Sequence, residues 1–138
     1  MKKVLLREIL DFGRAYEPLD SPPRFFIGLD DLEIYKREEL IERFGFTEEN
    51  FAEELEYSRF APMFRVYMPD KEREFLNAEN DRRLSEKIKE LNDNELDYFF
   101  EVWIETRYGA GCRWGEFERG FLAKAAAEWC KSLHIPCE

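Results

Sequence analysis

A wide apolar face at helical spacing runs through residues 114–135 and constrains the fold more than any other feature of the sequence. Apolar residues recur there in two adjacent rows, and charged residues occupy much of the opposite side. The first row is Phe117, Phe121, Ala125, Trp129 and Leu133, and the second is Leu122, Ala126 and Cys130. Small alanines beside large rings allow neighbouring elements to approach closely. The pattern predicts a central helix against which other elements pack.

A second broad apolar face precedes this helix, in residues 95–108. Gly109-Ala110-Gly111 is a short connection between the two helices. We therefore expect a C-terminal antiparallel helix pair whose aromatic and sulfur-bearing side chains are buried against each other. Residues 135–138 leave the last helix and are expected to run extended against a sheet.

The first half of the chain contains short extended segments. Aromatic and β-branched residues on both sides of Asp30-Asp31 predict a β-hairpin over residues 24–37. Residues 64–68 alternate as a third strand that ends at Pro69. An alternative for the hairpin's second half is a helix that starts at Asp30 or Asp31 and continues to Phe44. Gly45 ends either structure.

The remaining pattern favours helices separated by breaks. Proline at position 18 and Ser21-Pro22-Pro23 break regular structure after an N-terminal helix that stops at Gly13. Thr47 starts a helix, because its hydroxyl is a good cap and acids follow it. Further helices are predicted over residues 70–80 and around Leu84, Ile88 and Leu91.

The predicted fold class is α+β, in a single domain over residues 1–138. A small antiparallel sheet, made of hairpin 24–37 plus strand 64–68, packs against five or six helices. The length suits one domain that buries its own core, and a hydrophobic share of 44% excludes a disordered chain.

The chain is acidic, with a formal net charge of −10 from 31 acidic and 21 basic residues. This charge repels a phosphate backbone, so nucleic-acid binding is disfavoured and a basic protein is the better partner. No apolar run reaches the length of a membrane span, and Arg7 and Glu8 interrupt the N-terminal segment too early for a secretory signal. Three cysteines, an odd number, argue against a disulfide framework and for the cytoplasm.

The residues that end the chain form a recognisable series in gapless register. They are Trp114, Phe117, Leu122, Ala126, Glu128, Trp129, Cys130 and Ile135. This series resembles the C-terminal signature of uncharacterised protein family 0158, a group of small bacterial proteins. Tyr98-Phe99-Phe100 and the extended segment 64–69 are also similar to family segments. The resemblance supports the fold and implies a bacterial, cytoplasmic origin, and it transfers no activity and no catalytic residue.

Three cysteines and the single histidine are candidate ligands of a structural zinc ion. They are Cys112, Cys130, His134 and Cys137. Their spacing differs from that of compact zinc knuckles. The competing interpretation is that Cys130 is a small buried hydrophobe and that His134 interacts with the dipole at the end of its helix.

Clustered carboxylates are the basis of an enzymatic alternative, a metal-dependent enzyme. The clusters are Glu38-Glu39-x2-Glu42, Glu48-Glu49 and Glu53-Glu54-x-Glu56. This alternative predicts a concave pocket with converging acids and strongly shifted carboxyl titration. The simpler interpretation places these acids, and also Glu72 and Glu74, on solvated helix faces.

Aromatic residues of the first half favour a protein interface rimmed by acids, although they would also fill a core. The candidate interaction residues are Phe25, Tyr35, Glu38, Glu42, Phe60 and Tyr67. We therefore expect a non-enzymatic, protein-binding or regulatory module that engages a basic protein without a cofactor. A regulatory adaptor and an immunity-like inhibitor both fit this description.

Overall fold

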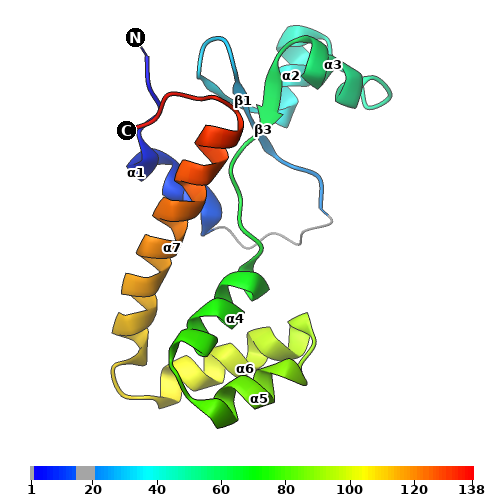
Figure 1. The fold of residues 1–138 in the computed structure, drawn as a ribbon. Coiled ribbons are helices and arrows are strands. Elements are labelled where there is room, and N and C mark those ends of the chain that lie inside the picture. Colours follow the sequence, from blue (N-terminus) through cyan, green and yellow to red (C-terminus); the bar gives the residue numbers. More distant parts are fainter. Residues whose placement is uncertain (1, 15–20) are drawn as a thin grey trace.

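The long helix predicted near the C-terminus is the axis of the structure, a computed structural model that describes residues 2–14 and 21–138. This helix, α7 (Ala110–Ser132), runs from a group of helices at one end to the sheet region at the other (Figure 1). The predicted α+β class is confirmed, and the expected break at residue 18 lies outside the described residues. The other elements are α1 (Leu6–Ile9), the 3-10 helix η1 (Leu10–Gly13), β1 (Phe25–Gly28), β2 (Ile34–Lys36), α2 (Arg37–Phe44), α3 (Phe51–Tyr57), β3 (Phe60–Pro62), α4 (Met68–Ala78), α5 (Arg82–Lys89) and α6 (Asp93–Thr106).

The predicted hairpin is present as β1 and β2, which pair in antiparallel register. Asp31 stabilises the connection, since its carboxylate accepts hydrogen bonds from the Glu33 backbone N–H at 3.0 Å and from the Tyr35 hydroxyl at 2.5 Å. The alternative helix from Asp30 or Asp31 is therefore wrong in its first half. Its second half is helical, because α2 follows β2 directly and ends at Gly45, which has a φ of 74°.

The third strand is not where the sequence predicted it. It is β3, which pairs with the free edge of β1 to give the strand order β2-β1-β3, whereas residues 64–67 lie in no strand. Arg59, with a φ of 58°, turns the chain after α3 so that the residues immediately following it reach β1. Pro69 does not end a strand, but lies in the first turn of α4, where its missing N–H costs no helical hydrogen bond.

The helix predicted from Thr47 starts at Phe51. Thr47 and Asn50 instead close a turn before it, since the backbone N–H of each donates to the side chain of the other, at 2.8 and 3.3 Å. Local side-chain bonds of this kind compete with helix formation, which accounts for the late start.

The apolar residues that the structure describes form three cores, and β1 separates two of them. Phe25 and Ile27 face a core shared with α1 and the second half of α7, whereas Phe26 faces a core shared with α2 and α3. Alternation along a strand places successive side chains on opposite faces of the sheet. The small sheet is thus covered on both sides.

The third core lies between α4, α5, α6 and the first turns of α7. Its centre is Phe75, whose ring centroid lies 5.2 to 6.2 Å from those of Phe100, Trp103, Trp114 and Phe117. Because Gly109 turns the chain sharply, with a φ of 73°, α6 extends away from the lower end of α7 in Figure 1 and packs largely on α4. The two helices of the predicted C-terminal pair, α6 and α7, therefore contact each other near the turn that connects them.

The second apolar row of α7 is buried as expected, since Leu122, Ala126 and Cys130 are each 0% exposed. The C-terminal segment runs extended, but beside the N-terminus and not against the three-stranded sheet. The backbone N–H of Val4 donates to the Pro136 carbonyl, and that of Glu138 donates to the Val4 carbonyl, both at 2.9 Å. The two chain ends therefore lie close together (Figure 1). Among the described helices, none has the length and apolar character that crossing a bilayer requires.

Candidate functional site

Two adjacent charged residues lie on the inner face of α4. Lys71 is 0% exposed and Glu72 is 1% exposed, so the solvated position expected for Glu72 is wrong. They precede the buried Phe75 and Leu76 by three to five positions, which places them on the same side of the helix. Charged residues are almost never fully buried without a partner, so the surroundings of these two decide what each can do.

Lys71 is held by an ion pair and a backbone contact. Its Nζ donates to Glu118 Oε2 at 2.7 Å and to the Gly13 carbonyl at 3.2 Å, and it lies 5.5 Å from the ring centroid of Trp114. Glu118 also accepts a hydrogen bond from Arg14 Nε at 3.2 Å. These bonds connect α4 and α7 to the end of η1, so Lys71 has a structural role.

Glu72 lines a surface pocket of about 410 Å³ formed by three helices. Met68 and Glu72 come from α4, and Trp114 comes from α7. The contribution of α6 is Asp97, Phe100 and Glu101. Three acids and two aromatic rings therefore converge at one place, which we call the Glu72 pocket.

The carboxyl group of Glu72 lacks one of its hydrogen bonds. Its Oε1 is buried and accepts no hydrogen bond from any described residue. The pKa of Glu72 is raised to about 8, first by burial and then by the charge of Asp97 and a hydrogen bond with it, while Lys71 lowers it in part. At neutral pH the group is mostly protonated, and the hydrogen bond raises the pKa because a neutral Glu72 donates its proton to Asp97. A neutral carboxyl group keeps one oxygen that can accept a hydrogen bond, and Glu72 receives none at Oε1 from any described residue.

The outer face of α6 extends from this pocket. Tyr98 is 72% exposed and Val102 is 43% exposed, and they lie one helical turn apart. The exposed Glu101 and Glu105 share this face. They follow Tyr98 by three and seven positions, and on an α-helix residues at these spacings lie on the same side. We call this set of four side chains the α6 face.

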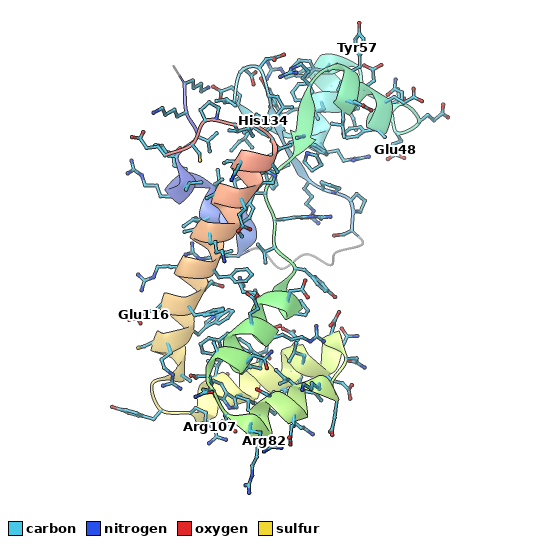
Figure 2. All side chains as sticks on the ribbon, viewed as in Figure 1. Glu48, Tyr57, Arg82, Arg107, Glu116 and His134 are labelled. Carbon is cyan, nitrogen blue, oxygen red and sulfur yellow. The ribbon has the colours of Figure 1, made fainter. Side chains whose placement is uncertain are left out.

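A second pocket, of about 440 Å³, is lined in part by Val102 and is mainly basic, with Asp81 as its one acidic lining residue. Its basic residues are Arg83, Lys87 and Arg107, and its rings are Phe99 and Trp103. Figure 2 shows Arg82 and Arg107 at the end of the molecule opposite Glu48 and Tyr57. The surface around α6 is therefore acidic on one side and basic on the other.

The interaction residues predicted from the sequence lie in three places. Tyr35 and Phe60 are half-buried and pack edge to face, with ring centroids 5.4 Å apart, while Glu38 and Glu42 are exposed on the neighbouring α2. Phe25 faces the opposite side of the sheet and packs on Phe12 at 5.2 Å. The structure thus brings four of the six candidates to one region, formed by β2, β3 and α2.

Tyr67 belongs to the other end of the molecule, just before α4. Its hydroxyl donates to Asp93 Oδ2 at 2.7 Å, and Arg73 also contacts Asp93, at 2.7 Å. Both contacts lower the pKa of Asp93, and the hydrogen bond from Tyr67 has the larger effect. Tyr67 therefore fixes the start of α6.

The four candidate zinc ligands are not all brought together, since Cys137 neighbours Cys130 but Cys112 lies far from both. Cys112 and Cys130 lie on the same helix 18 positions apart, which corresponds to about 27 Å along its axis. His134 is exposed and takes a left-handed conformation, with a φ of 56°, at the end of α7. The Ile135 N–H donates to the Cys130 carbonyl at 2.8 Å, so His134 occupies a position in the helix terminus that is usually glycine.

The three thiols should differ strongly in reactivity. Cys112 is exposed, whereas the pKa of Cys130 is raised to about 12, first by burial and then by the neighbouring Cys137. We expect iodoacetamide at about pH 8 to modify Cys112 first and Cys130 only after unfolding, because the thiolate is the reacting form. Peptide mass spectrometry at successive times measures this order, and equal rates at Cys112 and Cys130 in the folded protein would contradict it.

The carboxylate clusters noted in the sequence lie mainly on exposed faces of α2, α3 and the turn between them. Within the described ranges 2–14 and 21–138, no three His, Cys, Asp or Glu side chains are grouped so that they could hold a metal ion. The acids that do converge, in the Glu72 pocket, were not among those clusters. Glu72 could have been found from the sequence, because it lies at helical spacing from Met68, Phe75 and Leu76.

Comparison with known proteins adds no relative. No protein-family model, no curated protein and no solved structure matches this chain, so its resemblance to uncharacterised protein family 0158 stays a prediction.

Proposed function

We propose that this protein is a non-enzymatic binding module that recognises a basic protein through the α6 face. One observation carries the proposal: the exposed Tyr98 and Val102 share a helix face with acids, and that face adjoins the Glu72 pocket. Large apolar side chains that are exposed together and rimmed by charge are typical of protein interfaces. Tyrosine is especially frequent there, because its ring buries a large area and its hydroxyl remains satisfied.

Binding would begin with long-range attraction and end with burial of apolar area. The net charge of −10 accelerates encounter with a basic partner. Burial of Tyr98 and Val102 then supplies the affinity, and the acids beside them fix the orientation. The basic pocket around Arg107 repels a partner that approaches in the reversed orientation. The bacterial cytoplasm is part of this proposal, and it rests on the odd number of cysteines and on the resemblance described from the sequence.

A capture experiment tests the proposal. The protein is immobilised as the wild type and as the double variant Tyr98→Ser/Val102→Ser, and both are exposed to extract at about 50 mM and about 500 mM salt. We expect the wild type to retain basic proteins at low salt and to release most of them at high salt. The double variant should retain at least about tenfold less, because the loss of two central apolar contacts costs more than about 1.4 kcal/mol.

Tyr57→Ser is the matched control. Tyr57 is 86% exposed and lies at the opposite end of the molecule, so the variant removes an exposed ring without touching α6 (Figure 2). It should capture as the wild type does. Salt-independent capture, or equal loss with Tyr57→Ser and the α6 variant, would refute the proposal.

The sequence suggested a metal-dependent enzyme that uses clustered carboxylates, and the second candidate is a metal-independent form of that enzyme, because no three such side chains among the described residues are grouped to hold a metal ion. The Glu72 pocket supplies two of the features that this hypothesis predicts, converging acids and a strongly raised carboxyl pKa. A protonated carboxyl group beside an indole ring is also suited to general acid catalysis. This candidate predicts that the pocket prefers an uncharged substrate such as a glycoside, which the titration described below distinguishes from a cation.

A further inference from the structure

The Glu72 pocket presents three kinds of ligand-binding group within one space. Glu72 contributes an almost fully buried acceptor, Oε1, that has no donor among the described residues. Asp97 and Glu101 contribute negative charge, one helical turn apart on α6. Trp114 and Phe100 contribute aromatic surface, with ring centroids 4.7 Å apart.

Together these groups favour an N–H donor that carries positive charge. An acceptor buried without a donor costs free energy that a ligand N–H recovers. Carboxylates bind donors most strongly when those donors carry positive charge. The faces of aromatic rings attract cations, and Trp114 already holds the Lys71 ammonium 5.5 Å from its centroid.

We propose that the Glu72 pocket binds the guanidinium group of an arginine side chain supplied by the basic partner. Glu72 and Asp97 accept its N–H groups, Glu101 adds charge at the rim, and Trp114 and Phe100 contact its apolar faces. This inference rests on the proposed function, since it names the side chain by which a basic protein would be anchored beside the α6 face.

A guanidinium group fits these surroundings better than an ammonium group does. It is planar, has five N–H donors and is weakly hydrated, so it satisfies several acceptors at once and loses less on entering a pocket lined by Met68 and two rings. An ammonium group is compact and strongly hydrated. It should bind in the same place but more weakly.

Small probes test the pocket directly on the full chain. Ethylguanidinium, propylammonium and two uncharged probes, N-ethylurea and a methyl glycoside, are titrated separately into the 15N-labelled protein at pH 6.5, and the indole N–H of Trp114 is followed by NMR. We expect saturable shifts at Trp114 and at the backbone of Glu72 and Asp97 with ethylguanidinium. N-ethylurea is planar and keeps three of the five N–H donors but has no charge, so it should bind at least about tenfold more weakly.

Variants separate the contributions of charge and acceptor. Asp97→Asn and Glu101→Gln should each weaken ethylguanidinium binding, with Asp97→Asn costing about tenfold. Glu74→Gln, which removes an exposed acid of α4 outside the pocket and outside the α6 face, is the control and should change binding less than about twofold. Glu72→Gln keeps the acceptor oxygen and should bind within a few-fold of wild type, whereas Glu72→Met removes it and should lose about tenfold. Circular dichroism confirms that each variant is folded.

The outcomes decide the inference independently of the proposed function. Absence of saturable shifts at Trp114, equal binding of N-ethylurea, stronger binding of a methyl glycoside, or an unchanged affinity in Asp97→Asn would each overturn the arginine site. Salt-sensitive capture of basic proteins that survives these failures would leave the proposed function standing. Specific guanidinium binding together with failed capture would refute the proposed function and retain the site.

Discussion

Replacement of Lys71 by methionine is expected to lower the free energy of unfolding by about 3 kcal/mol. Lys71 is 0% exposed, and its ammonium compensates Glu118, whose side chain is only 15% exposed. Removal of one partner of a buried ion pair leaves the other charge without compensation, which costs more than the pair contributes when intact. Arg14 still contacts Glu118 in this variant and limits the loss. Urea denaturation measures the difference.

Two further variants show whether the loss comes from the ion pair. Lys124→Met removes an exposed lysine from α7 and should change stability by less than about 0.5 kcal/mol. The double variant Lys71→Met/Glu118→Gln should be less destabilised than the sum of its single variants, because neither charge then remains alone. Additive effects, or a stable Lys71→Met protein, would mean that the ion pair does not connect α4 to α7 as the structure indicates.

The elements that the sequence predicted well are those whose pattern depends on a local period. The two apolar rows of α7 identified a helix with a buried face, because adjacent rows share one face on a helix but alternate between faces on a strand. The hairpin was identified because aromatic and β-branched residues flank a pair of aspartates, and Asp31 does bond within the connection. Both predictions needed only residues close in sequence.

The predictions that failed depended on contacts between distant residues. Residues 64–68 alternate as a strand should, but strand formation requires a neighbour, and the edge of β1 is occupied by β3. The chain turns at Arg59 through a left-handed conformation, and the sequence gives no signal for it because glycine, the usual residue in this conformation, is absent at that position. The destination of residues 135–138 was likewise set by the distant Val4.

The candidate site was missed for a different reason. Glu72 is followed by Arg73 and Glu74, so the stretch has the composition of a solvated surface. The prediction of a solvated Glu72 relied on these charged neighbours and not on its helical spacing from apolar residues. Its position relative to Phe75 and Leu76 placed it on the apolar side of α4. Asp97 and Trp114 meet it only because α6 and α7 fold back onto α4. The type of helix face was predictable, and the convergence of three helices was not.

The Glu72→Gln variant is expected to be more stable than the wild type at pH 8 and above. The pKa of Glu72 is about 8 in the folded protein, mainly through burial, against an ordinary value of 4.5. Between these values the folded state holds a proton that the unfolded state has released. The free energy of unfolding of the wild type should therefore fall as the pH rises from about 4.5 to about 8.

Glutamine resembles the protonated carboxyl group and does not titrate, so the variant should lack this decrease. Near pH 5 the two proteins should differ by less than about 1 kcal/mol, whereas at pH 8 the variant should be more stable by an amount on the order of a few kcal/mol. Glu74→Gln is the matched control, because it removes the same charge from an exposed position on α4 and should keep the wild-type pH dependence. Urea denaturation at intervals between pH 5 and 9 gives the three curves. Parallel curves for wild type and Glu72→Gln would mean that Glu72 is already ionised in the folded protein at neutral pH. Stability falls with rising pH only where the folded state holds a proton that the unfolded state has released, and an ionised Glu72 holds none.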